Sequence, residues 1–317
     1  MMYLEHPPRV IESRVHTAMP EEFRRRGAPP AWAKANKGGH PVDCFIEGPS
    51  FDRDGNLYLV DIPYGRIFRI SPDLKWTQIA EYDGQPNGLK FHPDGRILIA
   101  DYANGLMQLD PATGSIVTVL SGRNGESFKG INDLNIASNG DIYFTDQGQT
   151  GLHDPSGRVY VLKANGDLHC LLDTGISPNG LTLDRSESVL FVAMTRDNAV
   201  WRMPLTTQGG AAKVGRFCSM FGASGPDGLA LDNEGNIAVA HASLGQVFLF
   251  APNGELIARV RSAAGPTCTN IAYGGPDGKQ MFITESSTGS VLVADMAVPG
   301  FPQPRNQALR NGNDNCK

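Results

Sequence analysis

The sequence has no long apolar segment and none of the common nucleotide-binding or hydrolase motifs. No run approaches the roughly 18 apolar residues of a transmembrane helix, and the N-terminal stretch MMYLEHPPRVIESRVHTAMP lacks the apolar core of a signal peptide. Walker, dinucleotide-binding, G-x-S-x-G and H-E-x-x-H motifs are also absent. These absences argue against a membrane protein, a nucleotide-dependent enzyme, a serine hydrolase of the α/β type and a zinc peptidase.

Cysteine is scarce, and its pattern does not suggest pairing. The chain has five cysteines, which is an odd number, and no C-x-x-C pair. Together with the missing signal peptide, this predicts free thiols and a cytoplasmic location. The five residues are Cys44, Cys170, Cys218, Cys268 and Cys316.

Positive charge is in the minority. The 28 Lys and Arg residues are outnumbered by 33 Asp and Glu, which gives a net charge of −5. The one short basic run, Arg24 to Arg26, is expected to be solvated surface. We therefore expect neither nucleic acid nor a membrane surface as a partner.

Glycine and proline, by contrast, are abundant. The 317 residues include 37 Gly and 22 Pro, above the usual proportions of about 7% and about 5%. Hydrophobic residues still make up 40% of the chain, enough for a buried core. This combination favours many short strands joined by turns over a helical bundle.

A turn followed by an apolar strand recurs six times, about every 45 residues. A short strand precedes each unit, and one or two strands follow it. Six units of four antiparallel strands predict an all-β fold, a six-bladed β-propeller around a central channel. The repeated strands are NLYLVD (56–61), RILIAD (96–101), DIYFTD (141–146), VLFVAM (189–194), NIAVAH (236–241) and KQMFITE (279–285).

The repeats assign the chain to one propeller domain, residues 40–298. Residues 1–39 are predicted to be an N-terminal extension, and residues 299–317 an irregular C-terminal tail. The sixth unit lacks a fourth strand of its own. Residues 40–46 (HPVDCFI) immediately precede the first unit and are predicted to supply that strand and close the ring.

One oxygen-bearing residue recurs in phase with the repeats, at the start of each first strand. Because first strands line the channel of a propeller, these side chains are expected to converge at one channel mouth. Asn-Gly and Asp-Gly are also common turn dipeptides, so a purely structural role is the alternative for the individual residues. The six residues are Glu47, Asn87, Asn132, Asn179, Asp227 and Asn270.

Two carboxylates and several amide oxygens suit a hard divalent cation. The sequence therefore predicts one metal ion, with Ca²⁺ favoured over Mg²⁺, Mn²⁺ or Zn²⁺. Such an ion can polarise a carbonyl and activate water, which is the chemistry of ester or lactone hydrolysis. His241 is predicted to emerge on the same rim and Lys129 to reach the channel mouth, where both could contact a substrate. The alternatives are that His241 is a rim residue without a functional role and that Lys129 is simply solvated.

The phased segments resemble the superfamily of gluconolactonase, regucalcin and senescence-marker protein. The similarity rests on Ile46–Phe51 with the strand NLYLVDI, on Ile131–Asp133, on Ser177–Leu181, on Gly225–Leu229 and on Thr269–Asn270. The resemblance implies that Glu47, Asn179 and Asp227 bind one divalent metal, that Asp227 is also the general base, and that Asn132 contacts the substrate.

The leading hypothesis is a metal-dependent lactonase in which Asn132 and Asn87 orient a small-molecule lactone. Gly130 stands where regucalcin-like proteins carry a sugar-contacting Arg, and Gln147-Gly148 replaces a Pro-Pro pair of gluconolactonases. A sugar lactone and a less hydroxylated lactone therefore both stay open. The alternatives are a phosphotriester or arylester hydrolase and a non-catalytic propeller that binds a metal or a protein partner. A homo-oligomer is left open.

Overall fold

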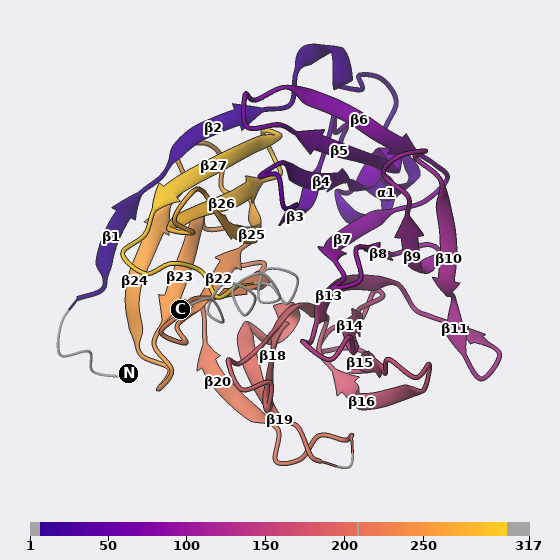
Figure 1. Ribbon diagram of the computed structural model, residues 1–317, viewed down its shortest axis with the longest axis vertical. Helices are drawn as coiled ribbons and strands as arrows, with labels where there is room; N and C mark the ends of the chain where they lie inside the picture. The colour runs from indigo at the N-terminus through magenta and orange to yellow at the C-terminus, as the bar shows by residue number, and fades with distance from the viewer. Residues whose placement is uncertain (1–6, 208, 303–317) are drawn as a thin grey trace, which may run out of the picture.

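Each repeat of the sequence forms an antiparallel sheet in the computed structural model, which describes residues 7–207 and 209–302. The six sheets are arranged as blades around a central channel, so the chain is a six-bladed β-propeller (Figure 1). Blade one contains β3 (Ile46–Phe51), β4 (Leu57–Asp61), β5 (Arg66–Ile70) and β6 (Trp76–Glu81); blade two contains β7 (Pro86–Phe91), β8 (Ile97–Asp101), β9 (Gly105–Leu109) and β10 (Ile116–Leu120); blade three contains β13 (Ile131–Ile136), β14 (Ile142–Asp146), β15 (Gly157–Leu162) and β16 (Leu168–Gly175).

A small hairpin of β11 (Gly122–Arg123) and β12 (Glu126–Ser127) projects between blades two and three. The remaining three blades follow the same order from the channel outward. Blade four contains β17 (Pro178–Leu183), β18 (Val189–Met194), β19 (Ala199–Pro204) and β20 (Gly215–Ser219); blade five contains β21 (Pro226–Leu231), β22 (Ile237–His241), β23 (Gln246–Phe250) and β24 (Leu256–Arg261); blade six contains β25 (Cys268–Gly274), β26 (Gln280–Glu285) and β27 (Ser290–Asp295).

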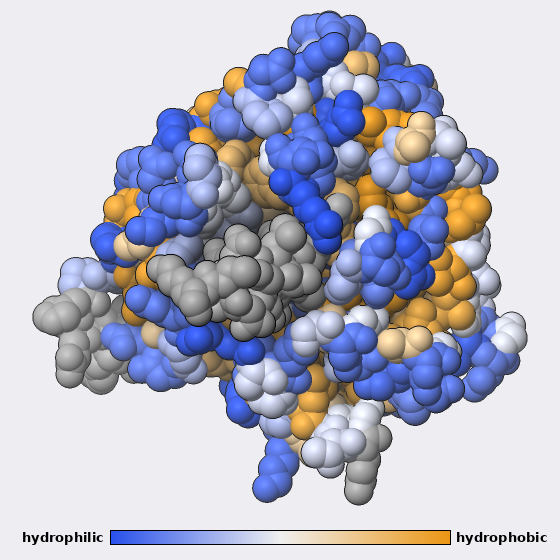
Figure 2. Space-filling view, in the orientation of Figure 1, coloured by the Kyte–Doolittle hydropathy of each residue, from blue (hydrophilic) through white to orange (hydrophobic). Residues whose placement is uncertain are grey.

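The core lies between neighbouring blades. In β4, Tyr58 and Val60 pack against blade two, whereas Leu57 and Leu59 pack against blade six. Both faces of the second strands are therefore buried, which explains why these strands are apolar at nearly every position. On the face shown in Figure 2 the projecting loops are mainly hydrophilic, and hydrophobic residues lie in the recesses between them.

The predicted closing strand is wrong. The fourth strand of blade six is β2 (Arg14–Ala18), which pairs antiparallel with β27. Residues 40–45 form no strand and lead directly into β3 at the channel. The outer edge of a blade is three strands away from its innermost strand, about 14 Å at the usual strand spacing. Because Ile46 already belongs to β3, the predicted segment would leave no residues to cross this distance.

The N-terminal residues are thus part of the ring. The strand β1 (Arg9–Glu12) adds a parallel fifth strand to blade five, beside β24. After β2 come two short helices, η1 (Glu21–Phe23) and α1 (Ala31–Asn36). The helix α1 packs on η2 (Ile62–Tyr64) and buries Trp32 in the core between blades one and two.

Other predictions concern the tail and the thiols. Phe301 donates its backbone N–H to Leu231, and residues 303–317 of the predicted tail lie outside the described residues. Four cysteines carry free thiols, and Cys316 lies outside the described part of the chain. None of the helices within residues 7–207 and 209–302 is both long and apolar enough to span a membrane.

Candidate active site at the channel mouth

The six in-phase residues lie at the same level of the channel. Five of them are the second residue of an innermost strand, and Asn270 is the third residue of β25. Neighbouring innermost strands contact one another around the whole ring, from β3 through β7, β13, β17, β21 and β25 back to β3. Each of these strands has a β-bulge at or next to the in-phase residue. Because a bulge re-aims side chains, it turns these groups out of the regular alternation.

Glycines let the innermost strands approach closely at this level. A Cβ atom on Gly180 would overlap the backbone of Asp227, and one on Gly228 would overlap Asn270. In blade three the equivalent position is Asp133, whose carboxylate occupies the space that a side chain on Gly88 would need. The channel therefore contains a third carboxylate for which the sequence had suggested no role.

A cavity of about 620 Å³ opens at this end of the channel. Asp227 and Asn87 are partly exposed, while the other four in-phase residues are buried. The in-phase residues that line it are Glu47, Asn87, Asn132, Asn179 and Asp227. The structure thus brings together all the predicted metal ligands and both predicted substrate-binding asparagines.

Asn270 belongs to the layer beneath the cavity. Its side chain donates through Nδ2 to Asp133 Oδ2 at 3.3 Å and accepts from the backbone N–H of Ile271 through Oδ1. Asn270 also hydrogen-bonds to the carboxylate of Glu47. It therefore supports two carboxylates from below and does not line the cavity.

The pKa values of three carboxylates in the channel are raised, chiefly by burial. Burial, with repulsion from Asp133, raises the pKa of Glu47 to about 7, although the N–H of Gly48 opposes the shift. Burial raises the pKa of Asp227 well above its usual range, and the charges of Glu47 and Asp133 act in the same direction. Burial likewise raises the pKa of Asp133, while Lys90 opposes this shift.

Hydrogen bonds fix the orientation of two asparagines. Asn179 donates to the carboxylate of Asp227, and its backbone carbonyl accepts from Thr145 Oγ1 at 2.8 Å. Asn132 donates through Nδ2 to Gln147 Oε1 at 2.8 Å, and Gln147 in turn donates to Ser177 Oγ at 3.0 Å. In both side chains the amide oxygen is left available to a cation or a substrate.

The site fits a divalent cation by the chemistry of its donors. The described residues contain no cluster of three His, Cys, Asp or Glu side chains that could hold a metal ion. At this cavity, however, two carboxylates lie together with amide oxygens, which are also metal ligands. Buried carboxylates this close to one another stay ionised only when positive charge offsets their repulsion. The hard oxygen donors Glu47, Asn179 and Asp227 suit Ca²⁺ and similar ions.

His241 is not at the cavity. It is fully buried, its Nε2 donates to the carbonyl of Phe221 at 2.8 Å, and its Nδ1 accepts from Ser243. It is the last residue of a second strand, where four other blades carry an acidic residue that accepts from the N–H just before the innermost strand of the same blade. Those equivalents are Asp61, Asp101, Asp146 and Glu285. The structure thus does not place His241 in the lining of the cavity, where the sequence predicts a substrate contact; the residue instead ties its loop to the blade.

Lys129 also points elsewhere. Its ammonium group donates to Ser156 Oγ at 2.6 Å, and the residue is exposed outside the cavity lining. Its Cβ lies against Gly148, which does line the cavity. The structure thus does not place Lys129 in the lining of the cavity.

The sequence also missed two cations that line the cavity. Lys37 follows α1, and Arg196 lies in η3 (Thr195–Asp197). Lys37 comes from a segment that does not repeat, whereas the loop that carries Arg196 recurs between second and third strands but has no basic residue at this position in blades one, two, five and six. The phase that identified the asparagines therefore gave no signal for either cation. Gln147 had been noticed only as a departure from gluconolactonases.

The family comparison agrees with this geometry. Residues 45–287 match the family described as SMP-30/Gluconolactonase/LRE-like region, which spans all six blades. The chain belongs to this family. The matched range contains all the in-phase residues but excludes α1 and Lys37.

Curated relatives carry lactonase names. A gluconolactonase of Zymomonas mobilis is 30% identical over 281 residues, covering 76% of this chain and 76% of the relative. The lactonase drp35 of Staphylococcus epidermidis is 30% identical over 261 residues, covering 78% of each chain.

Solved structures share the fold. A calcium-binding protein, regucalcin, from Agrobacterium tumefaciens superposes with a TM-score of 0.73 at 22% identity, covering 94% of this chain and 99% of its own. A gluconolactonase from Xanthomonas campestris gives a TM-score of 0.71 at 21% identity, covering 90% of this chain and 100% of its own. At this identity the similarity establishes the propeller alone.

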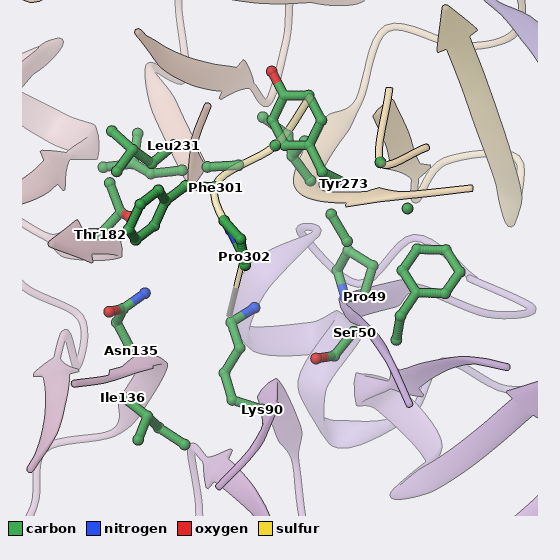
Figure 3. A pocket seen from close by; sticks show the side chains of 18 of the residues that line it. Pro49, Ser50, Lys90, Asn135, Ile136, Thr182, Leu231, Tyr273, Phe301 and Pro302 are labelled. Carbon is green, nitrogen blue, oxygen red and sulfur yellow. The ribbon is translucent and has the colours of Figure 1, made fainter. Parts of the chain in front are cut away.

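A second cavity, of about 510 Å³, lies at the other ends of the innermost strands. Figure 3 shows Lys90 and Asn135 pointing into it, beside Phe301 and Pro302 of the C-terminal segment. From this side the positive charge of Lys90 acts on Asp133 and opposes the rise in the pKa of its carboxyl. The two cavities are thus separated by the layer that contains Asp133.

Proposed function

We propose that this protein hydrolyses a small lactone, with one divalent cation held by Glu47, Asn179 and Asp227. The observation that carries the proposal is the convergence of buried carboxylates and oriented amide oxygens at the mouth of a 620 Å³ cavity. The lactonase names of the relatives support the same reaction. Ca²⁺ is the favoured ion because the donors are hard oxygens.

A bound divalent cation supplies a Lewis acid that polarises the carbonyl and lowers the pKa of water. Asp227 accepts the proton of the attacking water, because its carboxylate opens onto the cavity. The water oxygen adds to the carbonyl carbon, the ring C–O bond breaks, and the protonated Asp227 returns the proton to the leaving ring oxygen, so that a hydroxy acid is released.

Asn132 and Asn87 orient the lactone. The bond from Asn132 to Gln147 leaves one N–H and the amide oxygen of Asn132 free at the cavity. That N–H can donate to oxygen atoms of the ring or to the developing oxyanion. Asn87 is the in-phase residue of blade two, as Asn132 is of blade three, and it also lines the cavity.

Metal removal and restoration test the proposal. Protein treated with a chelator is assayed with γ- and δ-lactones before and after addition of Ca²⁺, Mg²⁺, Mn²⁺ or Zn²⁺, next to an aryl ester and a phosphotriester. We expect lactone hydrolysis to fall at least about 100-fold without metal and to return with Ca²⁺. Full activity in chelator, or turnover of the phosphotriester alone, would contradict the proposal; metal binding without any turnover would favour a non-catalytic propeller.

A further inference from the structure

Two cations face the cavity from outside the ring of in-phase residues. Lys37 comes from the N-terminal segment after α1, and Arg196 from η3, between the second and third strands of blade four. Lys37 is partly buried and Arg196 is exposed. Neither forms an ion pair with another residue in the described part of the chain.

Aromatic rings hold the Lys37 ammonium in place. Its Nζ lies 4.2 Å from the ring centroid of Phe45 and 5.6 Å from that of Trp32, and both rings are buried. An ammonium over such rings is stabilised and loses freedom to swing into solvent. Lys37 and Arg196 are also within electrostatic reach of each other, and Lys37 is within reach of Asp227.

The charges of the cavity wall do not balance once a divalent cation is counted. Glu47 and Asp227 are the only carboxylates among the described residues that line the cavity. A divalent cation offsets these two charges, which leaves Lys37 and Arg196 uncompensated at the entrance. Clefts with charge of one sign concentrate ligands of the opposite sign.

We propose that Lys37 and Arg196 form an anion subsite, and that the preferred substrate is a lactone that also carries a carboxylate. This inference rests on the proposed lactonase function. The ring carbonyl is directed toward Glu47, Asn179 and Asp227, while the second, non-reacting carboxylate meets the two cations. A neutral lactone has no group that uses this subsite.

Matched substrates test the subsite. γ-Butyrolactone-γ-carboxylate and its carboxamide have the same ring and nearly the same shape but differ in charge. We expect the wild-type protein with Ca²⁺ to prefer the carboxylate by about 10- to 100-fold in kcat/KM, chiefly through KM. The variants Lys37→Ala and Arg196→Gln should remove most of this preference and leave the carboxamide rate within about threefold.

Two further variants separate charge recognition from other roles. Lys37→Arg should keep much of the preference, because it keeps the positive charge. Lys34→Ala is the control, since Lys34 is exposed on the same helix and does not line the cavity. If Lys37 serves only as a counter-ion for Asp227, Lys37→Ala will slow both substrates equally, and the proposal falls.

A binding measurement keeps the inference independent of turnover. The carbocyclic ketone analogues of the same pair, in which a methylene group replaces the ring oxygen, cannot be hydrolysed as lactones. Calorimetry with the Ca²⁺-loaded protein should give at least about tenfold tighter binding of the carboxylate, and Lys37→Ala should abolish the difference. Equal affinities would overturn the subsite even if lactones are hydrolysed. A retained difference without any hydrolysis would support the subsite and refute the proposed reaction.

Discussion

At the scale of single residues, the site is governed by carboxylates that repel one another when no cation is present. Glu47 and Asp227 come from blades one and five, and Asp133 lies beneath them from blade three. Their positions are held by backbone and amide donors, so the side chains cannot simply separate. The same arrangement that destabilises the metal-free protein therefore favours a divalent cation.

Glu47→Gln should change stability in opposite directions with and without metal. The pKa of Glu47 is about 7 in the folded protein and 4.5 in the unfolded chain, so between these values the folded state binds more protons. The free energy of unfolding therefore falls as the pH rises through this range. In chelator at pH 8, the neutral amide of this variant should therefore raise Tm, by about 2–4 °C per kcal/mol gained. With excess Ca²⁺ the variant should melt below the wild type, which thermal denaturation in both buffers can measure.

Calcium affinity should depend on pH near neutrality. Because protons compete with the cation at Glu47 and Asp227, affinity should fall as pH drops through about 7. Calorimetric titration between pH 8 and pH 6 should show roughly a tenfold loss per pH unit below the pKa for each proton displaced. A pH-independent affinity over this range would contradict the role of Glu47.

The predicted residues that the structure brings together at the cavity are those that repeat. In a propeller, residues at the same position of each repeat lie at the same level of the channel. The in-phase residues that line one cavity for this reason are Glu47, Asn87, Asn132, Asn179 and Asp227. His241 is not one of the in-phase residues; it was expected at the rim only because it follows a second strand. A residue at the end of a second strand faces its own loop, and burial lowers the pKa of this imidazole. Lys37 lies in an unrepeated segment, and Arg196 is the one basic residue at its position of a loop that recurs in blades one, two, five and six.

At the scale of elements, the bulged start of each innermost strand shapes the site. Glycine after the in-phase residue lets the next strand come close, as Gly180 does beside Asp227. The strand carrying Asp227 is thus held directly against the strand carrying Asn179. Spacing between these two strands sets the distance between two of the proposed metal ligands.

Gly180→Ala should weaken the site as well as the fold. The added methyl group would overlap the backbone of β21 near Asp227, so the strands must separate. We expect a loss of about 1–3 kcal/mol in the free energy of unfolding. We also expect weaker Ca²⁺ binding by calorimetry. Gly215→Ala in β20 is the control, because its added Cβ meets no atom within 4 Å and should leave both quantities nearly unchanged.

The positions of the strands in the sequence were predicted better than the pairing between strands. Alternation and turn residues locate the second strands of all six blades almost to the residue, since these strands are buried on both sides. The closing strand β2 was missed, because RVHTA is short and partly exposed and resembles no repeat. Only the three-dimensional position of β27 makes its edge available to this segment.

At the scale of the whole molecule, the ring is closed by pairing a strand from one end of the chain with strands from the other. In Figure 1 β2 lies along β27, and β1 continues beside β24. Without these strands, blades five and six would expose hydrogen-bonding edges. Closure therefore couples the N-terminal segment to the rigidity of the channel.

Deletion of residues 2–18 should open this closure. It removes β1 and β2, so we expect a fall in Tm of at least about 5 °C and increased aggregation on heating. Deletion of residues 2–8, which precede both strands, is the control and should leave Tm within about 1 °C. Equal melting of the two deletions by scanning calorimetry would show that closure contributes little.

The central claim is that Asp227 and a divalent cation act together on a lactone in the channel mouth. The most direct measurement is kcat/KM for the best lactone, with saturating Ca²⁺, in the wild type and in Asp227→Asn. Asn keeps an oxygen for the cation but removes the base, so we expect a fall of about 100- to 10,000-fold with Ca²⁺ still bound. A rate within about threefold of the wild type would contradict the account.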